Sequence, residues 1–235
     1  MSRARWGVVL LLASALALAA LAFSRPRPPR PPEAKPTLLL LTSLPLVFGE
    51  QFSLHDAGSP TLKALETRYR VVPISVTGPT DLSKGRVLLM AHPLAQTAEN
   101  LVALDAWVRR GGRVLLLADP LLEWPSERPL GDPLRPPAMF MDTGLLQHWG
   151  VSLAGPDRRG PQLRRLGGRD VLTVSPGSLE GACEIAGDHF VAHCRVGQGR
   201  ATIVADADLL DTRHLDRRAA SNLDGVVAEL ADLQR

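Results

Sequence analysis

The stretch AENLVALDAWVRRGGRVLLLADP, residues 98–120, decides the fold class. Its first half repeats apolar residues three and four positions apart, which indicates an amphipathic helix that ends at the glycine pair 111–112. The glycines lead into RVLLLA, residues 113–118, an all-apolar run typical of strands that are buried on both faces. Asp119 and Pro120 then open a turn. The stretch therefore predicts one helix-to-strand unit of an α/β sheet.

Three further apolar runs precede this unit and predict buried strands of the same sheet, at residues 37–42, 71–76 and 86–91. A helix start lies between the first two runs, because Ser59 can cap a helix and Pro60 suits its first turn. Strands that are separated by helices or loops in this way predict a doubly wound, mainly parallel α/β sheet with right-handed crossovers.

The pattern is weaker in the second half of the chain. Residues 120–137 are rich in proline and lack any apolar period, so we expect a long loop there. Short β-like signals at 151–199 predict a small β-rich insertion. A last core strand at 201–205 and a final helix that Ser221 caps complete the predicted domain.

The N-terminal segment WGVVLLLASALALAALAF, residues 6–23, is apolar throughout and has arginines on both flanks. We expect residues 1–23 to form an uncleaved, single-pass inner-membrane anchor with the body in the periplasm, because the run is longer than the apolar part of a usual signal peptide. The small residues at 20–22 would suit a cleavage site, so a signal peptide is the alternative. Residues 24–36 are proline-rich and predict an extended stalk before the body, residues 37–235.

The excess of positive charge belongs to the tether. The whole chain has 27 Lys and Arg against 24 Asp and Glu, and residues 1–36 contain six of the basic residues and one of the acidic ones, which leaves 21 basic and 23 acidic residues in the body. A slightly acidic body with a single tyrosine offers no basic, aromatic surface. The composition therefore excludes nucleic acid as the expected partner.

The two cysteines, Cys183 and Cys194, flank a predicted hairpin turn. With a four-residue loop, 187–190, they face each other across the strands, which favours a disulfide in an oxidising compartment. A two-residue loop would pair Cys183 with Ala192 and leave two buried thiols. We expect the disulfide, since a zinc site needs more ligands than this hairpin supplies comfortably.

Ligands of open α/β sheets bind beyond the carboxyl ends of the strands. The polar residues at the predicted strand ends are therefore the candidate ligand-binding residues, and they are Ser43, His92, Asp119, Asp206 and Asp208. The three aspartates could hold Mg²⁺ or act as acid and base, but an aspartate after a strand more often opens the next turn. The sequence favours turn formation, so we predict neither a metal site nor catalytic residues.

Other chemical motifs are missing. No Gly-x-Ser-x-Gly elbow surrounds Ser43, and a lone histidine such as His92 is more often a satisfied polar residue than a base. The glycines at 197 and 199 lack the third glycine and the following helix of a dinucleotide-binding fingerprint, which favours a tight turn. No phosphate-binding P-loop occurs, so we expect no ATP hydrolysis and no cofactor.

Two segments carry a resemblance to a known family. LVALDAWVRRGGRVLLLADPLLEWPSERPL (101–130), followed by GLLQHWGVSL (144–153), resembles the extracytoplasmic auxiliary proteins of uncharacterised ABC-type transport systems, which are related to the gliding-motility auxiliary component. The tail VGQGRATIVADADLLD…SNLDGVVAEL (196–230) is similar to the end of such domains, with Asn222 at the head of the last helix. The resemblance implies a flavodoxin-like fold of the class I glutamine amidotransferase type, without the amidotransferase cysteine.

The resemblance also implies partners in the membrane, namely the permease and ATPase subunits of an ABC transporter. We therefore expect a membrane-anchored, non-catalytic binding or scaffold domain that is accessory to an ABC-type transport or envelope assembly. One alternative is a hydrolase that uses the strand-end carboxylates or His92. Another is an envelope- or carbohydrate-binding module.

Overall fold

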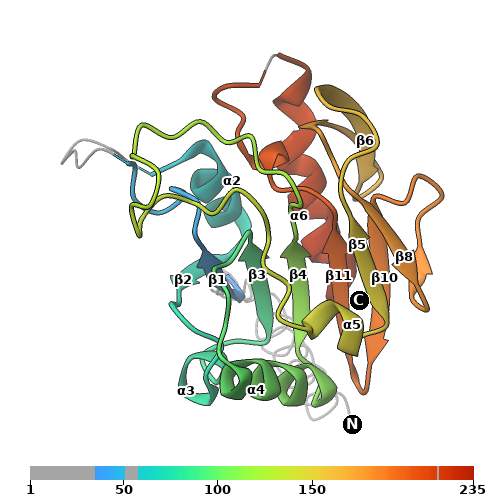
Figure 1. Ribbon diagram of the computed structural model, residues 1–235. Coiled ribbons are helices and arrows are strands. Elements are labelled where there is room, and N and C mark those ends of the chain that lie inside the picture. The colour runs from blue at the N-terminus through green and yellow to red at the C-terminus, as the bar shows by residue number, and fades with distance from the viewer. Residues whose placement is uncertain (1–34, 51–57, 216) are drawn as a thin grey trace, which may run out of the picture. The chain divides into compact units, whose positions relative to one another are not determined.

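The computed structural model describes residues 35–50, 58–215 and 217–235, which form one α/β body around a seven-stranded sheet (Figure 1). The strands, in their order across the sheet, are β2 (Arg70–Pro73), β1 (Thr37–Thr42), β3 (Val87–Ala91), β4 (Arg113–Leu117), β11 (Gly199–Val204), β10 (Val191–Val196) and β9 (Glu184–Ile185). The first five are parallel, whereas β10 and β9 run antiparallel to their neighbours. The parallel part has the flavodoxin-like strand order, which confirms the predicted fold class.

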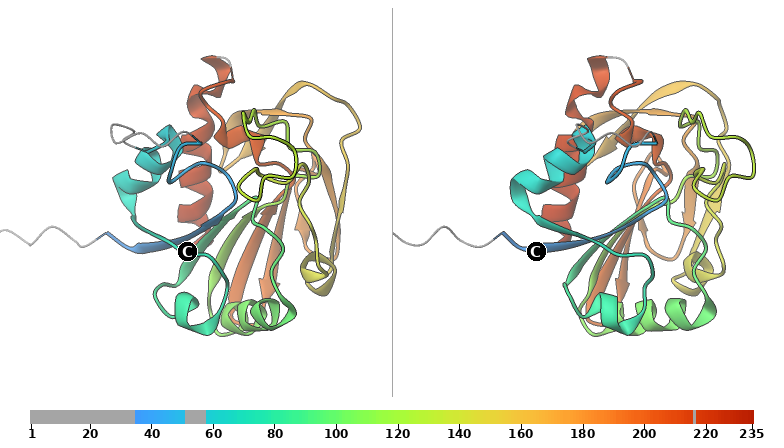
Figure 2. Two further views of the ribbon diagram at one scale, coloured as in Figure 1. Left: turned by 60° about the vertical axis from the view of Figure 1, so that its left-hand side comes forward. Right: turned by 90° about the vertical axis from the view of Figure 1, so that its left-hand side faces the viewer.

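The helices cover both faces of the sheet (Figure 2). They are α2 (Pro60–Arg68), α3 (Pro79–Leu82), α4 (Ala98–Arg109) and α6 (Asn222–Leu233). The first and last of these contact each other on one face, while α3 and α4 contact each other on the opposite face. The Ser59 hydroxyl caps α2 as the sequence predicts, because its oxygen accepts the N–H of Leu62 at 3.0 Å.

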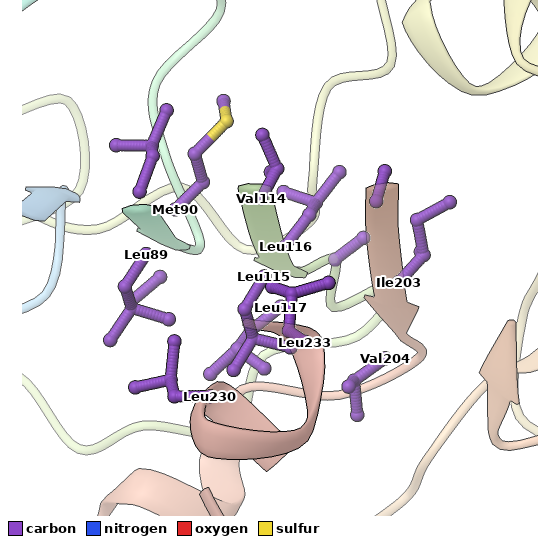
Figure 3. Packing of buried hydrophobic residues seen from close by; sticks show 14 of the residues in the cluster. Leu89, Met90, Val114, Leu115, Leu116, Leu117, Ile203, Val204, Leu230 and Leu233 are labelled. Atoms are coloured by element: carbon purple, nitrogen blue, oxygen red, sulfur yellow. The ribbon is translucent and has the colours of Figure 1, made fainter. Parts of the chain in front are cut away.

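The core lies between the sheet and these helices. The central strands carry apolar side chains toward both faces, and since helices cover both faces, residues such as Leu88 and Leu115 are completely buried. Leu230 and Leu233 of α6 pack against side chains of β4 and β11 (Figure 3). In the glycine pair that follows α4, position 112 requires glycine, because a Cβ atom on Gly112 would overlap the indole ring of Trp107.

Between β4 and β11, which are neighbours in the sheet, the chain carries an insertion of antiparallel strands. It consists of α5 (Leu145–His148), β5 (Val151–Ala154), β6 (Pro161–Leu166), β7 (Arg169–Val174) and β8 (Ser178–Gly181). Within it, β5 pairs with β8 and β6 pairs with β7, each as a two-stranded sheet. Residues 118–144 contain no helix or strand, and they include the proline-rich loop predicted at 120–137. Two 3₁₀ turns, η1 (Asp208–Leu210) and η2 (Arg217–Ser221), connect β11 to α6.

Asn222 joins the insertion to the last helix. Its side-chain oxygen accepts the N–H of Leu172 in β7 at 2.8 Å, and its amide nitrogen donates to the carbonyl oxygens of Leu172 and Leu209, each at 2.7 Å. The fully buried amide thus continues the ladder of β7 on the side that has no strand. The predicted cap by Ser221 is wrong, because its hydroxyl donates to the carbonyl oxygen of Asp170 and makes no bond to the helix.

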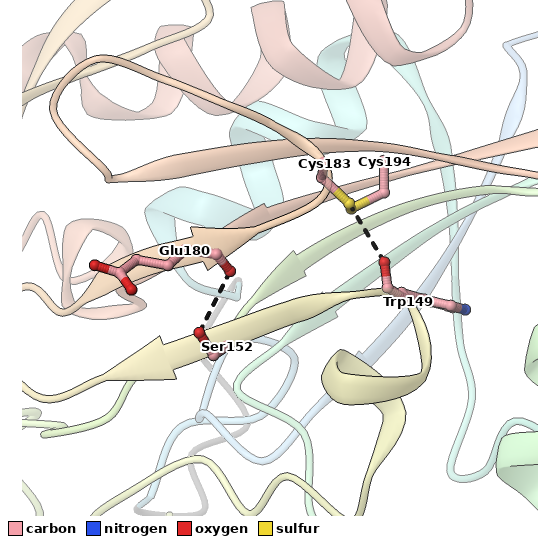
Figure 4. Close-up of a disulfide and its surroundings, with 5 residues drawn as sticks. All are labelled: Trp149, Ser152, Glu180, Cys183 and Cys194. Carbon is pink, nitrogen blue, oxygen red and sulfur yellow. Dashed lines mark hydrogen bonds between the residues drawn. A yellow bond between two sulfur atoms is a disulfide. The ribbon is translucent and has the colours of Figure 1, made fainter.

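The cysteine hairpin has the four-residue loop. Ile185 pairs with Ala192, and the chain turns through 187–190. Cys183 and Cys194 therefore face each other with their Cα atoms 4.8 Å apart, and they form a disulfide (Figure 4).

The bounds of one other strand differ from their prediction, and the predicted anchor is not tested. The strand predicted at 71–76 spans Arg70–Pro73, although the N–H of Ile74 still donates to the carbonyl oxygen of Leu40 at 2.9 Å. Pro73 is tolerated because this strand forms an edge of the sheet. The apolar run 6–23 lies outside the described residues, as does most of the stalk. Within the part of the chain that the structure describes, no helix is long and apolar enough to cross a membrane.

Candidate functional site

The five candidate residues all lie where strands of the central sheet end. Ser43 follows β1 and His92 follows β3. Asp119 follows β4 at two residues' distance, and Asp206 and Asp208 follow β11. Because β4 and β11 are parallel neighbours, these aspartates meet, and one carboxylate oxygen from each lies within 4.8 Å of the others. The structure thus brings together three of the five predicted site residues.

Asp119 ties the two loops together. Its Oδ1 accepts the N–H of Leu121 at 2.8 Å, in the loop that the residue itself opens. Its Oδ2 accepts the N–H groups of Ala207 at 2.9 Å and Asp208 at 3.3 Å, in the loop after β11. The turn-opening role that the sequence favours is therefore present, and it extends across two strands.

The other two aspartates also receive backbone N–H groups. Oδ1 of Asp206 accepts from Leu209 at 2.9 Å, and Oδ2 of Asp208 accepts from Glu123 at 2.8 Å. Oδ2 of Asp206 is buried and has no hydrogen-bond partner. The hydroxyl of Thr173 in β7 lies against this carboxyl group closely enough to lower its pKa, yet Thr173 Oγ1 also lacks a hydrogen bond of normal geometry.

Burial dominates the electrostatics of the cluster, since Asp119 and Asp206 are 0% exposed and Asp208 is 3% exposed. Loss of hydration raises the pKa of Asp119 to about 6, against the opposing effect of its three backbone N–H bonds. Burial, together with the charge of Asp119, raises the pKa of Asp208 to about 8. The same causes, in the same order, raise the pKa of Asp206 well above its ordinary value.

His92 and Ser43 form a separate pair. His92 is completely buried, adopts a left-handed backbone with φ of 46°, and its Nε2 lies 2.8 Å from the carbonyl oxygen of Pro137. The Ser43 hydroxyl donates to the carbonyl oxygen of His92 at 2.5 Å. Burial lowers the pKa of His92, which keeps its ring neutral, so Nε2 carries the hydrogen and donates it to Pro137. Among the described residues, no hydrogen bond or ion pair joins this pair to the aspartates.

A cleft of about 440 Å³ opens beside the cluster, and its walls include Glu50, Trp124, Asp211 and His214. The start of α2 contributes a further wall, at Ser59. The three clustered aspartates and His92 do not line this cleft. Ser43 lines a smaller neighbouring groove.

Sequence reasoning missed the Asp211–His214 pair. Both carboxylate oxygens of Asp211 lie within 2.8 Å of Nδ1 of His214, which holds the imidazole with Nδ1–H toward the carboxylate. Asp211 is buried, while the His214 side chain is 57% exposed at the cleft. The signal was present as Asp-x-x-His just after the last core strand, a spacing that brings two side chains together in one turn.

Comparison with solved structures shows the fold and no more. No known protein family and no curated protein matches the sequence. The cytoplasmic protein STM3548 from Salmonella typhimurium superposes with a TM-score of 0.52 at 10% identity, over 83% of this chain and 98% of that protein. The exo-β-1,4-mannosidase Op5Man5 from Opitutaceae bacterium strain TAV5 has a TM-score of 0.52 at 15% identity, over 83% of this chain.

This chain spans only 36% of the mannosidase, so that similarity concerns one part of a longer enzyme. A ThuA-like protein from Parabacteroides merdae is more distant, with a TM-score of 0.34 at 11% identity over 73% of this chain and 79% of that protein. At these identities the two better superpositions establish a shared α/β fold, and they transfer no activity.

Proposed function

We propose that this chain is a non-catalytic binding domain, anchored to the membrane by residues 6–23 and accessory to an ABC-type transport or envelope assembly. One observation carries the binding role. The open cleft lies beyond the carboxyl edge of the parallel sheet, where α/β domains bind their ligands, and the buried strand-end residues stand behind its walls. Their backbone hydrogen bonds hold the loops that shape the cleft.

The mixed wall of the cleft suits recognition. Trp124, Pro45 and Pro125 supply apolar surface, and Glu50, Asp211 and Arg213 supply charge. A hydrolase that used His92 would need a proton path to a histidine that is 0% exposed and already bonded through Nε2. The resemblance of the sequence to auxiliary proteins of ABC-type systems supports a transporter as the partner.

The test is site-specific photo-cross-linking of the full-length chain in its native membrane. A photoreactive phenylalanine replaces Arg213, an exposed residue of the cleft, in one variant. It replaces Arg110, an exposed residue that does not line the cleft, in the matched control. We expect position 213 to cross-link to a permease subunit of an ABC transporter, identified by mass spectrometry, and position 110 to give no such product.

Equal cross-linking at both positions, or cleft products that contain no transporter subunit, would refute the proposal. A parallel assay addresses catalysis. If the purified chain hydrolyses a simple ester and His214→Ala abolishes this activity, the cleft is an active site and the non-catalytic role is wrong.

A further inference from the structure

The three aspartates behind the cleft form a compact set of oxygen ligands. One carboxylate oxygen each of Asp119, Asp206 and Asp208 lies within 4.8 Å of the other two. Two parallel neighbouring strands fix their positions, and backbone N–H groups orient every one of the carboxylates. Each carboxylate oxygen has two lone pairs, so an oxygen that accepts one N–H can still bind a cation.

The set lacks positive charge. None of the lysine, arginine and histidine side chains that the structure describes forms an ion pair with the three aspartates. The backbone N–H of Glu123 donates to Asp208, which places a further acidic residue next to the set. Buried carboxylates without a counter-charge are costly, so either protons or a cation must neutralise them.

Two buried polar atoms at the cluster favour a cation over protons as the neutralising species. Asp206 Oδ2 and Thr173 Oγ1 both have no hydrogen-bond partner, and both residues are 0% exposed. The threonine comes from β7, in the insertion, and its hydroxyl lies beside the Asp206 carboxyl group. The hydroxyl oxygen of Thr173 and the carboxylates that follow β4 and β11 are all oxygen atoms, the ligand type that hard cations prefer.

We propose that Asp119, Asp206 and Asp208, together with the Thr173 hydroxyl, bind one divalent cation of the hard class that prefers oxygen ligands, Ca²⁺ or Mg²⁺. The cation would join the loop after β4, the loop after β11 and strand β7. Because the loop after β11 continues through η1 to Asp211, the cation would also stiffen one wall of the cleft. The site goes beyond the proposed binding function and does not depend on it.

The test uses the full-length chain, stripped with EDTA and then titrated with CaCl₂ or MgCl₂ alone. Isothermal titration calorimetry and thermal unfolding both report on binding without any assay of function. We expect a one-to-one stoichiometry and a melting temperature that rises with cation concentration. Asp206→Asn should weaken binding at least tenfold, since an amide is a weaker ligand, whereas Asp157→Asn, at an exposed position, should leave binding unchanged.

Thr173→Val keeps the size of the side chain and removes only the hydroxyl, so it serves as a second variant if Asp206→Asn does not fold. We expect Thr173→Val to lower the affinity by a factor of about ten, in the range found when partners of a metal site are removed. Absence of heat and of any thermal shift in the wild type at millimolar cation would show that the cluster holds protons only. Equal shifts in the wild type and in both cluster variants would show non-specific surface binding. Either result overturns the proposal.

Discussion

Replacement of Asn222 by alanine should be among the most destabilising single changes in the body. The substitution removes the partner of three backbone groups, which are the N–H and the carbonyl oxygen of Leu172 and the carbonyl oxygen of Leu209. Both leucines are at most 2% exposed, so water cannot readily replace the lost bonds. An unpaired buried polar group costs about 1–3 kcal/mol, so three of them give a loss of about 3–9 kcal/mol in the free energy of unfolding.

Asn222→Asp distinguishes this cause from a simple loss of volume. An ionised carboxylate still accepts the N–H of Leu172, but it faces the carbonyl oxygens of Leu172 and Leu209 with no hydrogen to donate. We expect Asn222→Asp to be at least as unstable as Asn222→Ala at pH 7. It should recover part of the loss near pH 4, where a protonated carboxyl group can donate one hydrogen bond.

Urea unfolding of the purified body, followed by circular dichroism, measures these differences. Ser221→Ala is the control, since it removes the hydroxyl of the preceding residue from an exposed bond to Asp170, and it should cost about 1 kcal/mol or less. A cost below about 1 kcal/mol for Asn222→Ala would refute the reasoning. An Asn222→Asp variant as stable as the wild type at pH 7 would refute it as well.

Three other predictions follow from particular contacts. The folded state holds His92 neutral, while an unfolded chain protonates it near pH 6.5, so its contribution to stability is present above that pH and is lost as the pH falls toward 5, by up to about 1.4 kcal/mol per pH unit. Urea unfolding of wild type and His92→Asn should therefore give a smaller difference in stability at pH 5 than at pH 7, and an equal difference at both would contradict this. Replacing Cys183 and Cys194 together by serine should lower the free energy of unfolding by about 3 kcal/mol under oxidising conditions, as expected for a loop closed at a separation of 11 residues. A wild-type urea midpoint that is the same with and without reductant would exclude a contribution of the disulfide. Gly199→Ala should lower the melting temperature, measured by differential scanning calorimetry, by several degrees, because its Cβ atom would overlap two backbone carbonyl oxygens. Gly187→Ala is the control and should have little effect, since the space around Gly187 is open.

The central sheet is predictable from sequence because its strands are apolar at nearly every position. The runs at 37–42, 86–91 and 113–118 match β1, β3 and β4 within one residue at each end. Parallel pairing then places the strand ends at one edge, so the meeting of Asp119 with Asp206 also follows from the pattern.

The insertion and the cleft are not predictable in this way. β6 reads PQLRRL and is half-exposed, and β7 is its only ladder partner among the described residues, so no continuous apolar run marks it. The Asp211–His214 pair follows a 3₁₀ turn, and no periodic pattern of apolar residues there predicts which side chains come into contact. The unpartnered Thr173 hydroxyl lies 33 positions before Asp206 in the sequence, and no local pattern predicts that two such distant residues pack together.

The position of β11 in the sheet has a consequence for how the chain is made. β4 has β3 on one side, but its other neighbour, β11, begins only after residues 118–198 have been synthesised (Figure 1). Until the ribosome has delivered that segment, the growing chain carries a strand of buried leucines with one row of peptide groups unpaired, a template for pairing with other nascent chains. Chains stalled within the insertion should therefore depend on chaperones to stay dispersed. Pelleting of ribosome-released fragments that end before Gly199 and after Val204 would show whether solubility returns once β11 is complete.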